Sequence, residues 1–222
     1  KLDYDIPMAE YWPAFGVNGK KNITVRQILN HTAGLQNMPM GLSCNDLSHW
    51  NKMVRETQKL KPSSKPGSKF AYHGITFTWL VGELAQIVDG RSFSEIMNAT
   101  ICQPLKIKEM YIGLPKSLDN KVAILDEPSP NPEMMKTKEP TAIPAWICPL
   151  ADWMNTKSAR HACLPSSNGI MSAQSIARHY AALLPGGVDG VELLPFKRLK
   201  LATQRQRLND GTYIHRGLGY SL

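Results

Sequence analysis

The sequence predicts a mainly α-helical fold with two short strand segments. Two Ser/Thr-x-x-Glu/Gln patterns, at Thr24–Gln27 and Ser92–Glu95, match the capping box that begins helices. The segment 75–88 carries apolar residues at helical spacing and is followed by Gly90, and glycine commonly ends helices. Strand-like segments occur only near 108–112 and 213–222. Helices should therefore far outnumber strands in this chain.

The N-terminal part is expected to form two helices. The first begins after Thr24, turns Val25, Ile28 and Leu29 inward, and ends at Gly34. Apolar residues then recur near helical spacing up to position 60. A second helix is therefore predicted from a cap at Asn45 or Asp46 to about residue 60.

The remaining elements follow from loop composition and apolar spacing. Residues 62–68 have loop composition, and the helix 75–88 carries an apolar stripe of Leu80, Leu84, Ile87 and Val88. Another helix runs from Ser92 to about residue 102, where Pro104 ends it. The proline-rich stretch 127–149 is interpreted as a surface loop. Ser172 is expected to cap the last helix, which ends near residue 184.

Composition is that of a globular protein. Hydrophobic residues make up 42% of the 222 residues and charged residues 20%. No apolar stretch approaches the roughly 20 residues that a membrane span needs. The net charge of +8 would suit an anionic partner, but the basic residues are spread and match no nucleic-acid motif. We therefore expect a solvated basic face, no nucleic acid and no membrane span.

The four cysteines indicate neither a disulfide framework nor a metal site. Cys44, Cys102, Cys148 and Cys163 are scattered and form no C-x-x-C pair, which slightly favours a reduced setting in the cytoplasm or an organelle. His161 and Cys163 are close in sequence but lack the further ligands of a zinc site. No metal is predicted.

Tyr72 is the candidate residue for chemistry. It ends a basic, Pro/Gly-rich loop just before the apolar helix that starts near residue 75. The backbone N–H groups of such a junction are unpaired, and a tyrosine held there near cations could serve as a base. The alternative is a buried tyrosine that packs against the helix start.

The flanking sequence resembles the serine beta-lactamase-like hydrolases, which include class C beta-lactamases, DD-peptidases and related esterases. Residues 23–35, ITVRQILNHTAGL, are similar to the family's T-hRxLLxHTSGL signature. Residues 2–7 and 11–13 resemble the LDLDDPV…YLP stretch before it, and residues 165–173 resemble PAxGhxSTA. The chain looks closest to the hydrolase region of plant proteins that also carry a UbiB-type atypical kinase region.

The resemblance implies an α/β fold of the beta-lactamase/transpeptidase type, in which an antiparallel sheet and a mainly helical lobe enclose the active site. The family's Ser-x-x-Lys is absent from these residues, and the family places it upstream of Leu2. Its late Lys/His-Thr-Gly strand would follow Leu222, and the loose match at residues 215–217 is interpreted as accidental. Residues 1–222 are therefore expected to be a partial domain that holds the helical lobe and the sheet margins and is inactive alone.

The chemistry that the resemblance implies is hydrolysis of a small-molecule ester or amide through an acyl-enzyme. Tyr72 would carry the proton to and from a serine outside this chain, without a cofactor. His73, Gly74 and Asn168 are expected to line the substrate. The family often has Asn or Ser at the position of Gly74, and this departure counts more against beta-lactamase activity than against esterase activity.

Two alternatives stay open. The first is a catalytically inactive pseudoenzyme or interaction module with the same fold, for which Gly74 is the main support. The second is a helical anion-binding protein, supported by net charge alone. The resemblance to the plant proteins also leaves room for a fused kinase-like region in the intact protein.

Overall fold

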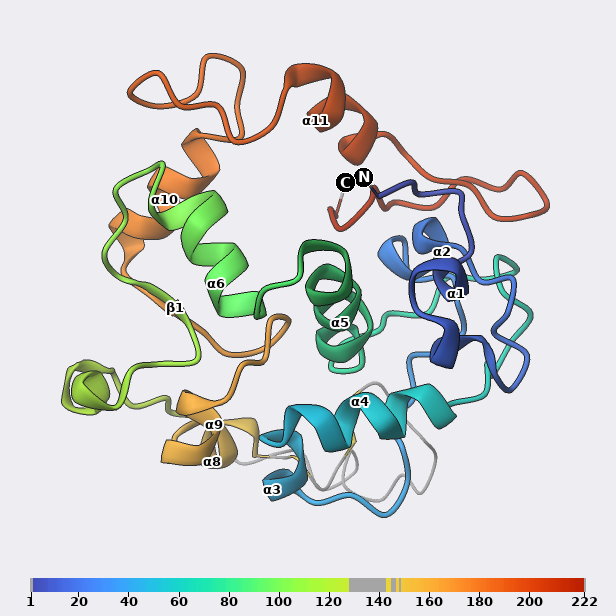
Figure 1. Cartoon of the computed structure of the whole chain (residues 1–222), viewed down its shortest axis with the longest axis horizontal. Helices are drawn as coiled ribbons and strands as arrows, with labels where there is room; N and C mark the ends of the chain where they lie inside the picture. Colours follow the sequence, from blue (N-terminus) through green and yellow to red (C-terminus); the bar gives the residue numbers. More distant parts are fainter. Residues whose placement is uncertain (1, 128–142, 145–146, 148, 222) are drawn as a thin grey trace.

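The computed structural model describes residues 2–127, 143–144, 147 and 149–221. Within these residues the chain is mainly helical and has a single two-stranded sheet. Helix α5 (Phe77–Asp89) lies in the middle of the molecule, with the N-terminal helices on one side and the sheet and α10 on the other (Figure 1). The predicted loop 127–149 lies mostly outside the described residues.

The elements before the sheet are short apart from α4 and α5. They are α1 (Met8–Tyr11), the 3₁₀-helix η1 (Pro13–Gly16), α2 (Val25–Leu29), α3 (Cys44–Leu47), α4 (Trp50–Lys59), α5, α6 (Phe93–Met97) and the π-helical turn η2 (Asn98–Cys102). The later elements are β1 (Met110–Ile112), the 3₁₀-helix η3 (Lys116–Lys121), α8 (Leu150–Met154), α9 (Lys157–His161), β2 (Gly169–Met171), α10 (Ala173–Ala181) and α11 (Phe196–Thr203).

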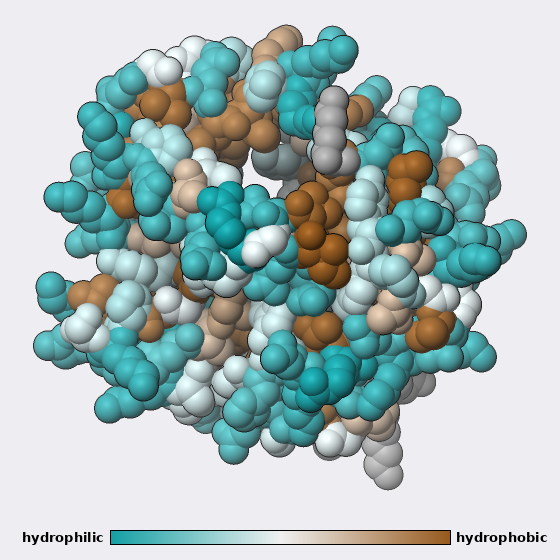
Figure 2. All heavy atoms as spheres, in the orientation of Figure 1, coloured by the Kyte–Doolittle hydropathy of each residue, from teal (hydrophilic) through white to brown (hydrophobic). Residues whose placement is uncertain are grey.

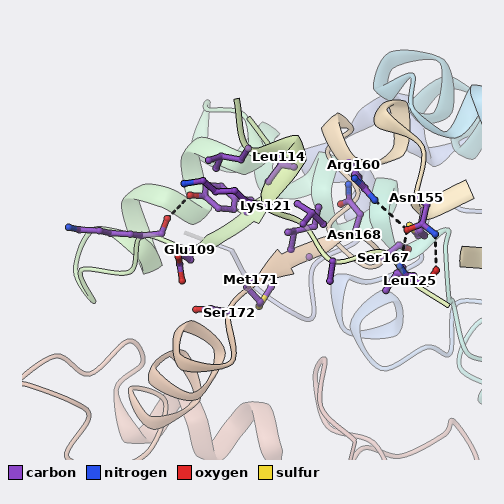
Figure 3. Close-up of a pocket in the computed structure, with 18 residues that line it drawn as sticks. Glu109, Leu114, Lys121, Leu125, Asn155, Arg160, Ser167, Asn168, Met171 and Ser172 are labelled. Carbon is purple, nitrogen blue, oxygen red and sulfur yellow. Dashed lines mark hydrogen bonds between the residues drawn. The ribbon is translucent and has the colours of Figure 1, made fainter. Parts of the chain in front are cut away.

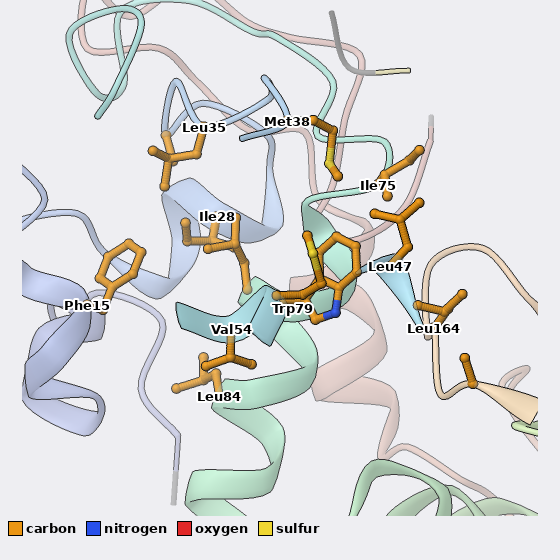
Figure 4. Close-up of a cluster of buried hydrophobic side chains, with 14 of the residues drawn as sticks. Phe15, Ile28, Leu35, Met38, Leu47, Val54, Ile75, Trp79, Leu84 and Leu164 are labelled. Carbon is orange, nitrogen blue, oxygen red and sulfur yellow. The ribbon is translucent and has the colours of Figure 1, made fainter. Parts of the chain in front are cut away.

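The core is built around α5. The indole of Trp79 is fully buried and lies among side chains of α2, α3, α4 and the loops that follow them, including Ile28, Leu47 and Val54 (Figure 4). Gly82 explains how closely α4 approaches α5, because a Cβ there would lie 2.6 Å from the ring of Trp50. The helical lobe is thus one packed unit that holds the N-terminus of α5 in place.

The predicted capping boxes are confirmed. Thr24 accepts a hydrogen bond from the backbone N–H of Gln27 and Ser92 accepts one from Glu95, and both boxes are complete. Gly90 ends α5 in the left-handed conformation (φ +87°), and Ser172 caps α10. These ends depend on local side-chain hydrogen bonds and on glycine's freedom at positive φ, so the local sequence is sufficient to predict them.

Several helix limits were predicted wrongly. The expected helix from residue 45 to residue 60 is two helices, and Ser43 rather than Asn45 or Asp46 caps the first of them. Helix α2 ends at Leu29 and not at Gly34. In the stripe of α5, Ile87 and Val88 are 40% exposed, since the core covers only the earlier turns of that helix.

The second half of the chain holds the sheet. Strands β1 and β2 pair antiparallel, with Met110 opposite Met171 and Ile112 opposite Gly169. The prediction of a strand near 108–112 is confirmed, but β2 was not predicted. The segment 213–222 forms only isolated bridges within the described residues, and α11 follows the helix that was expected to be the last.

Lys20 is an unusual member of the core because its side chain is fully buried. Its Nζ donates hydrogen bonds to the backbone carbonyls of Val17 (2.8 Å), Gln58 (2.8 Å) and Leu60 (2.5 Å). Burial lowers the pKa of this amine to about 8. One buried amine thus binds carbonyl oxygens from the end of α4 and from the turn before residue 20.

The surface is mostly hydrophilic on the face shown in Figure 2, with hydrophobic side chains in separate groups. Helices α10 and α11 expose several large apolar side chains, namely Ile176, Tyr180 and Phe196. Among the described residues, no helix combines the length and the hydropathy that crossing a bilayer requires.

Candidate active site

Two loops meet beside the start of α5 and are joined by hydrogen bonds. The first follows α2 and contains His31 and Leu35, and the second contains Tyr72. The N–H of Ala71 donates to the His31 carbonyl (2.9 Å), and the N–H of His73 donates to Nδ1 of His31 (3.2 Å). In return, the N–H of Leu35 donates to Nε2 of His73 (3.0 Å). The backbone on both sides of Tyr72 is therefore fixed to the loop after α2.

The conformation of the first loop follows from where α2 ends. His31 adopts φ +61°, which reverses the chain directly after the helix. Gly34 has φ +74°, and a Cβ there would lie 2.8 Å from the Ser64 carbonyl oxygen. Gly34 is thus needed for the close approach of the loop 62–68 and not for ending the helix.

Tyr72 is not a core residue. Its side chain is 49% exposed, and its ring centroid lies 4.8 Å from that of His31. The guanidinium carbon of Arg216 lies 5.5 Å from the centre of the Tyr72 ring and 5.2 Å from that of Phe70. The phenol ring is thus in contact with the buried His31 ring and close to a cation, while part of the side chain is open to solvent.

The two histidines beneath Tyr72 are held neutral. Burial, and then the charge of Arg216, lowers the pKa of His31 to about 4. Burial lowers the pKa of His73 to about 3. Each ring also accepts a backbone hydrogen bond on one nitrogen, which a proton on that nitrogen would break. The hydrogen bonds that the two rings accept and their lowered pKa values both indicate neutral histidines.

The other candidate residues lie in different surroundings. The His73 side chain has no exposed surface, so its position favours holding the Tyr72 loop over touching a substrate. Gly74 is half-buried, and its carbonyl accepts a hydrogen bond from Ser166 Oγ (3.0 Å). Asn168 is buried, and its amide binds the backbone of Leu164, Ala159 and Ala162, as a turn-forming asparagine does.

The segment 165–173 contacts the Tyr72 loop directly. Ser166 Oγ also lies 2.6 Å from Thr78 Oγ1, at the start of α5. The similarity of this segment to PAxGhxSTA pointed to the region, but neither Ser166 nor Arg216 was predicted at the site. No local pattern marks them, because both are brought there by long-range packing. Among the described residues no group of histidine, cysteine and carboxylate side chains is arranged to hold a metal.

A family comparison accounts for these shared motifs. The sequence model of the family described as Beta-lactamase matches residues 1–222. The chain belongs to the beta-lactamase family. Membership explains why the HTAGL loop, the Tyr72 loop and the segment 165–173 converge at one place.

Relatives in this family include esterases and beta-lactamases. The chain is 29% identical over 227 residues to the esterase/beta-lactamase LipL of Mycobacterium tuberculosis, with 93% of this chain and 51% of that protein covered. It is 26% identical over 117 residues to a beta-lactamase of Escherichia coli, with 53% of this chain and 30% of that protein covered. The chain therefore spans about half, or less, of the length of these relatives.

Solved structures of the family have the same fold. A family VIII carboxylesterase superposes with a TM-score of 0.84 at 27% identity, over 100% of this chain and 60% of that one. A penicillin-binding protein homologue from Caulobacter crescentus gives 0.80 at 29% identity, over 99% and 60%. EstA from Arthrobacter nitroguajacolicus gives 0.81 at 28% identity, over 99% and 62%. The fold is thus of the beta-lactamase/transpeptidase type.

Proposed function

We propose that this chain is part of a serine hydrolase that cleaves small-molecule esters through an acyl-enzyme, with Tyr72 as its proton carrier. The observation that supports this most is the placement of Tyr72. It is half exposed on a loop fixed by backbone hydrogen bonds, and the cation of Arg216 lies beside its ring. A substrate can reach a side chain that is fixed and half exposed in this way.

The proposed reaction has two halves. A serine supplied from outside these 222 residues attacks the ester carbonyl while its hydroxyl proton passes to Tyr72, which in this proposal enters the reaction with its phenol oxygen deprotonated. The carbon–oxygen bond of the leaving alcohol then breaks, and the alcohol takes that proton. Water adds to the acyl-enzyme in the second half and releases the acid and the serine.

The preference for esters over amides depends on Gly74. In the proposed site this residue brings a backbone carbonyl, already bonded to Ser166, and no side chain. Nothing at this position can donate a side-chain hydrogen bond to a substrate amide. The relatives named above include a carboxylesterase and an esterase/beta-lactamase, which supports the same choice.

A pseudoenzyme or interaction module is the second candidate. Gly74 also supports it, because this residue has no side chain at the position where the family that the sequence resembles often has Asn or Ser. The specific similarity to plant proteins with a UbiB-type kinase region, and the fused kinase-like region that it would bring, stays a prediction. The organisms named above, Mycobacterium tuberculosis, Escherichia coli, Caulobacter crescentus and Arthrobacter nitroguajacolicus, are bacteria and not plants.

The intact protein is expected to hydrolyse p-nitrophenyl butyrate much faster than nitrocefin, by at least about tenfold in kcat/KM, a difference of roughly 1.4 kcal/mol in barrier. Mass spectrometry of the quenched reaction should show the protein heavier by one butyryl group. Turnover of neither substrate, together with no butyryl adduct, would favour the pseudoenzyme. Equal turnover of both substrates would contradict the proposal that Gly74 favours esters over amides.

The 222-residue chain alone is expected to hydrolyse neither compound above the rate of its own Tyr72→Phe variant. The reason is that Ser-x-x-Lys does not occur in these residues, and nucleophile, base and oxyanion donors act as a unit. The comparison of the two purified chains under identical conditions tests this. A clear excess for the unmodified chain would show that a nucleophile lies within it.

A further inference from the structure

A cavity lies between the two-stranded sheet and the segment that follows β1, and Tyr72 does not line it. It encloses about 660 Å³, within the usual size of small-molecule sites, and is bounded by β1, η3, α8, α9 and β2 (Figure 3). Tyr72, His73 and Gly74 are not among the residues that line it. Of the candidate site residues, Asn168 does line it, so the cavity is distinct from the Tyr72 loop but borders the candidate active site.

Most of the cavity wall is apolar. The side chains come from the residue that precedes η3 by two positions, from η3 and the residues after it, from α8 and from β2. They are Leu114, Leu118, Val122, Leu125, Met154 and Met171. Such a wall favours an occupant with a hydrocarbon body.

Arg160 supplies a buried cation on one side of this wall. It lies on α9, is only 8% exposed, and its backbone carbonyl is fixed by the N–H of Leu114 (2.8 Å). A guanidinium has five N–H donors, yet its one side-chain hydrogen bond within the described residues is a long contact to Asn155 Oδ1 (3.4 Å). No described carboxylate pairs with it. A buried guanidinium in this state has donors available for an anion in the cavity.

The charges at the cavity are mostly positive. Lys108 and Lys121 are exposed lining residues, and Glu109 is the one carboxylate among the lining residues. Together with Arg160, cations therefore outnumber anions by three to one at this site. This excess would draw a negatively charged ligand toward the opening.

The segment over the cavity is already held in place. Asn155 accepts from the N–H of Leu125 (2.9 Å) and donates to its carbonyl (2.8 Å). His161 Nε2 lies 2.8 Å from Asp119 Oδ1, and the N–H of Ala151 donates to Glu127 Oε2 (2.8 Å). Because three separate contacts fix residues 119–127, a ligand would not have to order this wall on binding.

We propose that this cavity binds a small amphipathic carboxylate, with its carboxylate on the Arg160 guanidinium and its hydrocarbon body against the apolar wall. The bidentate geometry of guanidinium suits a carboxylate, and the cavity is large enough for a chain of several carbons. This inference does not rest on the proposed ester hydrolysis. The cavity and Tyr72 do share one loop, since Ser167 and Asn168 line the cavity while the adjacent Ser166 bonds to Gly74.

The test is calorimetric titration of the intact protein with octanoate, octanol and acetate. Octanoate is expected to bind at least about tenfold more tightly than either of the others, because only octanoate offers both the charge and the chain. In the Arg160→Met variant, octanoate affinity should fall by about 10- to 100-fold, the range for loss of a charge-assisted hydrogen bond. Octanol should bind this variant as it binds the unmodified protein.

Two further variants keep the result interpretable. Lys157→Met removes an exposed cation from the same helix, outside the cavity lining, and should leave octanoate binding unchanged. Leu118→Trp fills the cavity without touching Arg160 and should abolish binding even if Arg160→Met fails to fold. Octanoate binding that survives Leu118→Trp, or octanol that binds as tightly as octanoate, would overturn the proposal, and so would no octanoate binding at all.

Discussion

Replacing Tyr72 with phenylalanine is expected to lower kcat of the intact protein by roughly 10²–10⁴-fold, the range for a positioned general base. The melting temperature should change little. The ring and its contacts with His31 and Arg216 stay in place, and the lost hydroxyl belongs to a side chain that is 49% exposed. One such hydroxyl contributes on the order of 1 kcal/mol at most. Paired measurement of kcat and melting temperature tests both expectations.

Tyr213 offers a matched control. It is also 49% exposed, and the cations of Arg205 and Arg207 lie over its ring, but it lies outside the pair of loops that hold Tyr72. Tyr213→Phe should keep near-normal kcat. A Tyr72→Phe protein that melts several degrees lower and keeps most of its kcat would assign Tyr72 to structure. Equal losses in the two variants would mean that the assay reports folding and not chemistry.

Acid is expected to destabilise the protein through His31 and His73. Their pKa values in the folded state are lowered to about 4 and about 3, whereas in the unfolded chain a histidine titrates near 6.5. Below about pH 6.5 the unfolded state therefore binds protons at these two histidines, whereas the folded state does not bind them until a lower pH. Above that pH, these two histidines should not change the free energy of unfolding. Below it, the free energy of unfolding should decrease by up to about 1.4 kcal/mol per pH unit for each histidine.

Variants that keep the hydrogen bonds can isolate this effect. His31→Asn preserves an acceptor near Nδ1 and tolerates the positive φ of that position, and His73→Gln preserves one near Nε2. Urea unfolding of the double variant between pH 7 and pH 4.5 should give a clearly shallower dependence on pH than that of the unmodified protein. His215→Gln changes an exposed histidine and should leave the slope as it was. An unchanged slope in the double variant would place the acid sensitivity elsewhere.

The parts of the fold that the sequence could predict are those with local causes. The capping boxes at Thr24 and Ser92 and the left-handed Gly90 depend on hydrogen bonds and backbone freedom within a few residues. Residue 43 was missed as a cap because the apolar spacing suggested one long helix, and that spacing does not show the break between α3 and α4. Strand β2 is only three residues long and is defined by its pairing with β1, which no local pattern contains.

The candidate site divides in the same way. The motifs marked the loops that contain His31, Tyr72 and Asn168, but not how those loops meet. That His73 is buried and that Arg216 lies beside Tyr72 both depend on contacts between segments far apart in the sequence. The cavity at Arg160 was invisible for the same reason, since its walls come from four separated stretches of the chain.

The buried amine of Lys20 has a consequence for how the N-terminal corner is held together. Many small proteins join distant loops through a bound metal ion, and that stabilisation weakens when the ion is diluted or chelated. Here the cation is part of the polypeptide and links carbonyls about 40 residues away in the chain. Its local concentration is therefore constant, so this junction between η1 and the end of α4 needs no dissociable metal ion to hold it together.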